Sequence, residues 1–268
     1  MKLGCASWGF RKLDVEDYLR TISELGLKFA EVECFNETAI PGKHIPSYIT
    51  ERDIVSLREK ADSLGVKIVS FAGGNDFTVQ DKSLISKDIS RIKKMIDLAK
   101  AGEVEIIRLF AGWIEEDKIT DSTYKQVINS FKEVGEYAQD KGIILALENH
   151  GGITATPEQI KRLLDGVNLS SVGFNYDPAN FHHCKVNSVK ALEMLKNYIV
   201  YVHLKDSQFE NGKHEYKAVG DGEIKWASIL NWLNTSYTGY AMIEYEDTAD
   251  VIEGTKRSLN FINQKGVI

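Results

Sequence analysis

Residues 143–150 read Ile-Ile-Leu-Ala-Leu-Glu-Asn-His, an apolar run that changes abruptly to polar and ionisable residues. An apolar run without alternation is typical of a strand covered on both faces, as in a parallel sheet. The acid, amide and imidazole that follow would lie at the carboxyl end of that strand. This stretch predicts a buried parallel strand with reactive groups at its end.

The same kind of apolar run occurs throughout the chain. The seven others are Lys2–Trp8, Phe29–Cys34, Lys67–Ala72, Val104–Phe110, Val172–Tyr176, Ile199–Leu204 and Tyr240–Tyr245. The segments between them have helical periodicity, clearest at spacings of 4, 3, 4 and 3 in the series Ile85, Ile89, Ile92, Ile96 and Ala99. This alternation predicts βα units around a parallel sheet.

The ends of the predicted helices carry their own signals. Asp121 or Ser122 could cap the helix that runs on to Gln139. Four glycines, each following a helical segment and preceding a strand, are expected to adopt the left-handed conformation that ends a helix. They are Gly26, Gly65, Gly102 and Gly142.

Eight units over 268 residues average about 33 residues each, which is enough for a strand, a helix and two short loops. The predicted fold class is therefore α/β, a single (β/α)8 TIM barrel, with residues 1–268 as one domain. The main rival is an open doubly wound sheet, which needs a phosphate-binding glycine turn after its first strand. The stretch Ala6-Ser7-Trp8-Gly9-Phe10 does not contain that turn.

The amino-acid composition of the chain argues against two classes of binding partner. The chain has 33 Lys+Arg against 39 Asp+Glu, a formal net charge of −6, so it has no overall field that would gather nucleic acid or anionic lipid. We expect neither nucleic acid nor membrane as a partner, and the absence of a long apolar run or signal-like N-terminus predicts a cytoplasmic protein. The three cysteines are far apart and predict reduced thiols.

Four consecutive predicted strands end in groups that can bind a metal. In chain order these groups are Glu148, Asp177, His203 and Glu244. Strand carboxyl ends meet at one mouth of a barrel, so these side chains are expected to converge. Three carboxylates in one cavity would repel one another unless a cation lay among them. The sequence predicts one divalent ion, with Mn or Mg favoured by the oxygen-rich set and Co or Zn as alternatives. Glu246, on the same strand face as Glu244, could replace it.

Two segments after strands are longer than their neighbours, Asn36–Thr50 and Asp206–Glu223. Both would overhang the same mouth, and either could act as a lid. Within the second, Gly220-Asp221-Gly222 predicts a turn before a helix that begins near Trp226.

A family resemblance is carried by motifs at these strand ends. They are Glu148-Asn149-His150-Gly151, Asp177-Pro178-Ala179-Asn180, His203-Leu204-Lys205-Asp206 followed by Gly220–Ile224, and Ile243-Glu244. Together they resemble the sugar phosphate isomerase/epimerase family, the xylose isomerase-like barrels, over essentially the whole chain. The resemblance implies the same four metal ligands, two of which, Glu148 and Glu244, would also handle the proton as catalytic residues. It further suggests a homodimer or homotetramer.

The chain departs from this family at one position. Epimerases and the endonuclease branch usually have a histidine three residues after the strand-six aspartate, whereas this chain has Asn180. The third and fourth strands also lack the extra histidines of a three-zinc cluster. Apurinic endonuclease activity is therefore disfavoured.

The predicted chemistry is proton transfer next to a carbonyl, in which one glutamate removes a proton and the other returns it. This predicts a sugar isomerase or epimerase acting through an enediolate. A dehydratase or lyase on the same site and a non-catalytic sugar-binding barrel are the alternatives. The substrate would be a small sugar or keto-polyol, contacted by the predicted substrate-binding residues. These are His150, Asn180, Lys205, Arg108, Trp8, Trp113 and His182.

Overall fold

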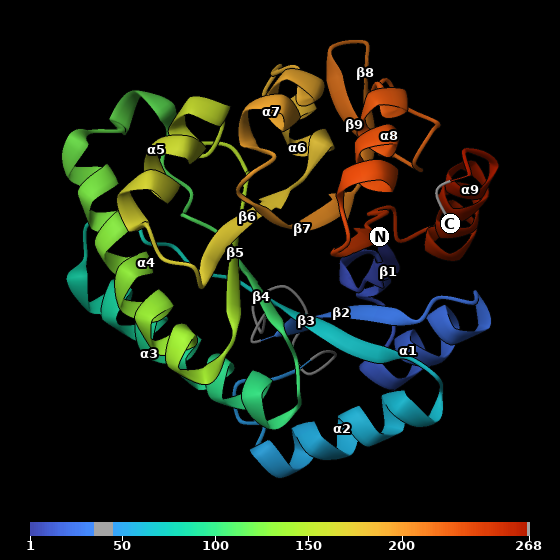
Figure 1. The fold of residues 1–268 in the computed structure, drawn as a ribbon, viewed down its shortest axis with the longest axis horizontal. Coiled ribbons are helices and arrows are strands. Elements are labelled where there is room, and N and C mark those ends of the chain that lie inside the picture. The colour runs from blue at the N-terminus through green and yellow to red at the C-terminus, as the bar shows by residue number, and fades with distance from the viewer. Residues whose placement is uncertain (35–44, 267–268) are drawn as a thin grey trace.

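The computed structural model describes residues 1–34 and 45–266. Eight parallel strands close into a barrel, and helices surround it (Figure 1). The barrel strands are β1 (Lys2–Ala6), β2 (Phe29–Cys34), β3 (Lys67–Gly73), β4 (Ile106–Leu109), β5 (Ile144–Glu148), β6 (Val172–Tyr176), β7 (Ile199–Leu204) and β10 (Tyr240–Ile243). They neighbour one another in chain order, and β10 pairs with β1 to close the ring. The predicted (β/α)8 fold is confirmed.

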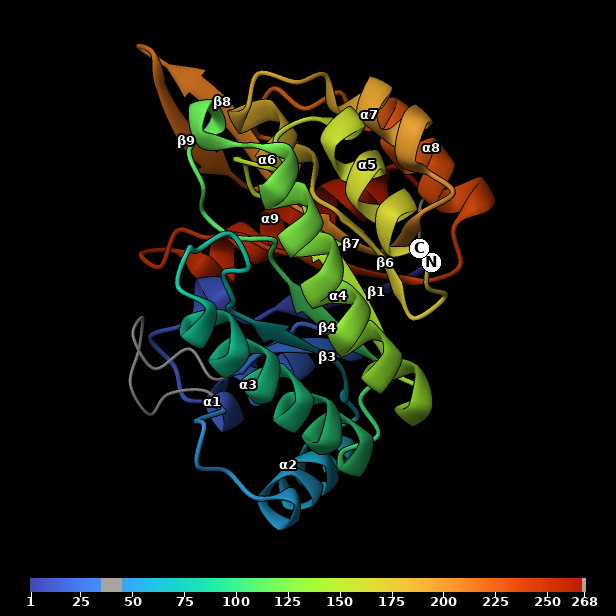
Figure 2. The ribbon, with the colours of Figure 1, turned by 90° about the vertical axis from the view of Figure 1, so that its left-hand side faces the viewer.

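The helices lie outside the barrel, where α3 and α4 pack side by side along it (Figure 2). Their bounds are α1 (Val15–Glu24), α2 (Glu51–Ser63), α3 (Lys82–Ala101), α4 (Asp121–Lys141), α5 (Pro157–Val167), α6 (Pro178–His183), α7 (Ser188–Leu195), α8 (Trp226–Ser236) and α9 (Val251–Gln264). Short 3₁₀ turns cover Trp8–Phe10 and Glu116–Lys118. Within the described residues, each of these helices is too short or too polar to span a lipid bilayer.

Two predicted helix ends are corrected by the structure. The N-cap of α4 is Thr120, because its hydroxyl accepts the amide of Thr123, so neither Asp121 nor Ser122 caps this helix. Gly102 has a φ of −86°, and the left-handed residue after α3 is Glu103 at 56°. The other three glycines have the predicted positive φ.

The barrel interior is divided into an apolar and a polar part. Apolar side chains from six strands form one cluster, namely Ala6, Val69, Ile106, Ala146, Tyr201, Tyr240 and Met242. Ionisable side chains occupy the carboxyl ends of the strands, including buried Glu148, His203 and Glu244. The apolar part closes the floor of the barrel, so water and ligand reach the ionisable groups from the carboxyl side.

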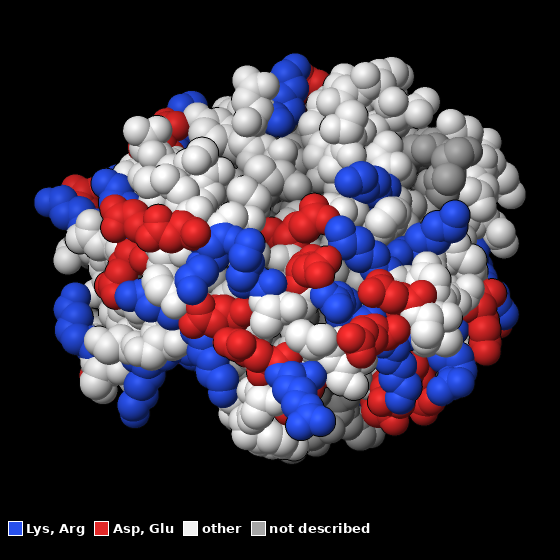
Figure 3. Space-filling model, turned by 60° about the horizontal axis from the view of Figure 1, so that its bottom comes forward, with Lys and Arg blue, Asp and Glu red and all other residues white. Residues whose placement is uncertain are grey.

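Charges on the outer surface are mixed in sign. On the face in Figure 3, acidic and basic side chains are intermixed over the lower half of the described surface. Elsewhere, surface pairs such as Lys67–Glu105, at 2.5 Å, show the same mixture. The electric fields of opposite charges this close to each other largely cancel at distances beyond about 8 Å at physiological ionic strength.

One of the two predicted lids is a β-hairpin rather than a loop. Strand β8 (Asp206–Glu210) pairs antiparallel with β9 (Lys213–Lys217), and this hairpin projects from the carboxyl side of the barrel (Figure 2). The other predicted lid, Asn36–Thr50, lies largely outside the described residues.

A buried aspartate holds the base of this hairpin. Asp206 is fully buried, and its carboxylate accepts five hydrogen bonds. The donors are the amides of Ser207, Gly220, Gly222 and Ile224 and the indole nitrogen of Trp226. The turn predicted at Gly220–Gly222 is confirmed, and α8 begins at Trp226 as expected.

We predict that Asp206→Ala lowers the free energy of unfolding by about 3 kcal/mol, because it leaves buried N–H groups without an acceptor. Denaturant titration of the full chain measures this loss. Asp221→Ala is the control, since Asp221 lies in the same turn but forms an exposed ion pair with Arg257, and it should change stability by less than about 1 kcal/mol. Equal losses for the two variants would contradict the assigned role.

Candidate metal centre

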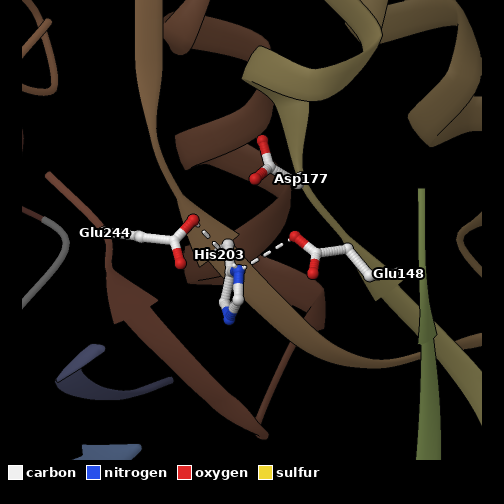
Figure 4. A group of neighbouring side chains, drawn as sticks. All are labelled: Glu148, Asp177, His203 and Glu244. Atoms are coloured by element: carbon white, nitrogen blue, oxygen red, sulfur yellow. Dashed lines mark hydrogen bonds and ion pairs between the residues drawn. The ribbon is translucent and has the colours of Figure 1, made fainter. Parts of the chain in front are cut away.

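Four side chains converge at the carboxyl mouth of the barrel, as predicted (Figure 4). Glu148 ends β5, Asp177 follows β6, His203 lies in β7 and Glu244 follows β10. Each is at most 4% exposed. One possible ligand atom from each lies within 4.8 Å of the others, so these four groups could hold a metal ion.

The histidine presents one ring nitrogen to two of the acids. His203 Nδ1 lies 3.2 Å from Glu148 Oε1 and 3.5 Å from Glu244 Oε2. The two glutamates approach this nitrogen from opposite sides (Figure 4). Burial opposes protonation of the ring, but Glu31, Glu244 and Glu148 outweigh it and raise the pKa of His203 well above its ordinary value.

Lys205 is buried directly against the acidic cluster. Its ammonium lies 2.9 Å from Asp177 Oδ2, 2.8 Å from Glu244 Oε2 and 2.9 Å from Glu246 Oε1. Burial would lower the pKa of Lys205, yet these carboxylates raise it well above its ordinary value. Lys205 therefore supplies positive charge to the acids as well as lining the cavity.

The surroundings do not stabilise the ionised forms of the acids equally. Burial opposes ionisation of Glu148, but His203 and Arg108 outweigh it and lower the pKa of this carboxyl to about 2. At Asp177, burial raises the pKa to about 7, with Glu148 and Glu244 adding to the effect and Lys205 opposing it. Asp177 is therefore the acid of this cluster whose ionised form is stabilised least by its surroundings.

These residues fit a divalent cation. Asp177 Oδ2 is buried and accepts no hydrogen bond from the described residues, although the charge of Lys205 is near. Its other oxygen accepts the amides of Ala179 and Asn180, which fixes the carboxylate in place. An oriented carboxylate oxygen beside two more carboxylates and an imidazole is a ligand set that suits Mn, Mg, Co or Zn.

A cavity of about 570 Å³ reaches two of the four groups, Glu148 and Glu244. The predicted residues Trp8, Arg108, Trp113, His150 and Lys205 all line it, together with Glu148, Glu244 and Glu246. The rings of Trp113 and His150 meet edge to face with their centroids 4.8 Å apart. Trp113 is 53% exposed, so it presents apolar surface to this cavity rather than packing in the core.

Two predicted substrate-binding residues lie elsewhere. Asn180 donates to Glu148 Oε1 at 3.2 Å and lines a neighbouring cavity of about 380 Å³. His182 belongs to helix α6 and not to a loop, and its Nδ1 lies 2.8 Å from the hydroxyl of Ser207. The hairpin holds His182 outside the lining of both cavities.

Glu246 lies beyond Lys205 rather than within the cluster of four. It contacts the ammonium of Lys205 and accepts the indole N–H of Trp8 at 3.3 Å. The geometry thus groups Glu244, and not Glu246, with the other three candidate ligands.

Two buried acids of the site are not among the residues predicted from the sequence. Glu31 lies beside His203, and Glu33 forms an ion pair with Arg108 at 3.0 Å. Both belong to β2, two residues apart, and so share one face of that strand. Two acids alternating with apolar residues inside a predicted buried strand are the signal that could have found them.

The sequence of this chain is similar to those of known proteins. The model of the xylose isomerase-like TIM barrel family matches residues 19–265. An inosose dehydratase of Glaesserella parasuis is 25% identical over 92% of this chain and 90% of its own length. The match to the inosose dehydratase of Clostridium perfringens, at 26% identity, spans only 56% of that protein and 55% of this chain.

Solved structures share the fold. A D-allulose 3-epimerase from Methylomonas sp. superposes with a TM-score of 0.80 at 16% identity, covering 99% of this chain and 98% of that one. The IOLI protein with a bound zinc atom has a TM-score of 0.79 at 19% identity and covers 99% of both chains. At these identities the likeness shows the barrel fold alone.

We predict that Lys205→Met destabilises the metal-free protein by about 3–5 kcal/mol, because it leaves buried carboxylates without a cation. Saturating Mn²⁺ should reverse much of this loss, since the ion supplies positive charge to the same oxygens. Denaturant titration in chelator and in MnCl₂ measures both values.

The control is Lys217→Met, whose ammonium pairs with Glu215 at 2.8 Å on the partly exposed hairpin. It should cost less than about 1 kcal/mol under both conditions. If Lys205→Met lowers the free energy of unfolding equally with and without metal, the interpretation that Lys205 and an ion share these carboxylates is contradicted.

Proposed function

Because this chain belongs to the xylose isomerase-like TIM barrel family, we propose that it is a divalent-metal-dependent enzyme that removes a proton next to the carbonyl of a keto sugar or keto polyol. The observation that carries this proposal is the buried cluster of three carboxylates and one imidazole nitrogen, two of whose acids, Glu148 and Glu244, line a cavity. Glu148, Asp177, His203 and Glu244 would hold the ion.

A bound ion would polarise the substrate carbonyl and stabilise the negative charge that develops on its oxygen. The two glutamates on opposite sides of His203 are suited to move the proton (Figure 4). Glu148 would remove it, because Arg108 and the amide of Asn180 hold this carboxylate ionised and in place, at 3.2 Å each. Glu244 would return a proton from the other side.

The fate of the substrate after proton removal decides the reaction class. Expulsion of the β-hydroxyl gives dehydration, and we favour it because the relative aligned over 92% of this chain is an inosose dehydratase. Return of the proton to the opposite face gives epimerisation, which the opposed glutamates would also permit. Both outcomes share the first step, and analysis of the product separates them.

The cavity suits an uncharged substrate. Each basic side chain of its described lining is paired with a carboxylate: Arg91 with Asp88, Arg108 with Glu33, and Lys205 with Glu244. A phosphate would have to compete with these pairs. Trp8 and Trp113 offer ring surface against which the C–H face of a sugar or cyclitol can pack.

We predict that the protein with Mn²⁺ exchanges the proton next to the carbonyl of an accepted keto sugar or inosose with solvent deuterium. Glu148→Gln should slow this exchange by about 10²–10⁴-fold, because the amide cannot accept the proton. Proton NMR in D₂O, over a panel of keto sugars and inososes, measures the rate.

Glu105→Gln is the matched control, since Glu105 pairs with Lys67 and Tyr240 at the opposite end of the barrel and should leave exchange unchanged. Undiminished exchange in Glu148→Gln would remove Glu148 as the base. Substrate binding without exchange in the unmodified protein would favour the non-catalytic alternative.

A further inference from the structure

The two ring nitrogens of His203 face different groups. Nδ1 faces the candidate metal ligands, whereas Nε2 points away from them (Figure 4). Nε2 lies 3.2 Å from Glu31 Oε1 and 3.3 Å from Glu31 Oε2. A ring nitrogen can bind an ion only through its lone pair, so Nδ1 is available when the ring proton is on Nε2.

Glu31 is rigidly placed to hold that proton. It lies inside strand β2 and is 1% exposed. Ser70, on the neighbouring strand β3, donates its hydroxyl to Glu31 Oε2 at 3.1 Å. An ionised carboxylate only accepts hydrogen bonds, so this arrangement favours the histidine form with its proton on Nε2.

Glu31 has no place in the reaction itself. It is neither one of the four clustered groups nor part of the described cavity lining, so it lies below the reacting groups. Burying a carboxylate is costly unless it is paired and hydrogen-bonded. Among the described residues, the hydrogen-bond partners of the Glu31 carboxylate include His203 and Ser70, so Glu31 is placed to act through the histidine.

We propose that Glu31 is the positioning residue that fixes the proton of His203 on Nε2 and thereby presents Nδ1 to a divalent ion. This inference rests on the metal site of the proposed function. Histidine ligands commonly donate their second N–H to a carboxylate, and loss of that partner typically weakens metal binding about 10–100-fold.

The test compares Mn²⁺ affinity in the full chain with Glu31→Gln. Both proteins are stripped with chelator and titrated with MnCl₂ by calorimetry. The dissociation constant should rise about 10–100-fold in Glu31→Gln, because the new amide can donate to Nε2 and so favour a proton on Nδ1. Loaded with Co²⁺, the variant should also show an altered visible spectrum.

Glu105→Gln is the matched control. Glu105 is an acid that pairs with Lys67 and Tyr240 at the opposite end of the barrel, away from His203. Its Mn²⁺ affinity should stay within about threefold of the unmodified protein. A merely structural role of Glu31 would lower the unfolding temperature of the variant equally with and without metal, and would leave the dissociation constant unchanged.

Ser70→Ala provides a second variant if Glu31→Gln does not fold. It removes one hydrogen bond to Glu31 and should raise the Mn²⁺ dissociation constant about two- to fivefold. Unchanged affinity in the folded variants, with normal binding by the unmodified protein, would overturn this inference alone. Failure of the unmodified protein to bind Mn²⁺, Mg²⁺, Co²⁺ or Zn²⁺ would overturn the proposed function as well.

Discussion

Mutual repulsion among three buried carboxylates is the constraint on which the whole site depends. Glu148, Asp177 and Glu244 are brought within a few ångströms of one another in a region almost closed to water. Such a cluster is stable only when positive charge lies among its oxygens. Lys205 and His203 supply part of that charge, while burial, with the charges of Glu148 and Glu244, raises the pKa of Asp177. A divalent ion would add positive charge among the same oxygens and would create a reactive centre.

The barrel makes this clustering possible because it brings strand ends that are distant in sequence to one mouth. Apolar side chains such as Tyr201 and Met242 fill part of the interior, and two of the acids, Glu148 and Glu244, line one cavity. Asp206 fastens the hairpin and the turn before α8 at the rim, through five hydrogen bonds. The reactive groups therefore lie at the carboxyl ends of the strands, as is usual in this fold.

The strands and the residues at their ends could be predicted, because they follow patterns that repeat along the chain. Contacts between side chains across the barrel could not be predicted in this way. Eight apolar runs predicted the strands, and the residues at four strand ends predicted the cluster. The hairpin was missed because its polar segment 206–217 pairs with itself outside the core. Asn180 and His182 lie on α6, which begins directly after Asp177, and are outside the described lining of the 570 Å³ cavity, so their role in substrate binding stays a prediction. The single-domain boundaries and the oligomeric state stay predictions.

The most direct test of the central claim is a crystal structure of the protein grown with MnCl₂, with anomalous scattering measured to locate manganese. The account predicts one strong peak per chain, about 2.0–2.6 Å from oxygens of Glu148, Asp177 and Glu244 and from Nδ1 of His203. No peak among these four side chains, or a peak held by other residues while Lys205 keeps its contacts, would contradict it.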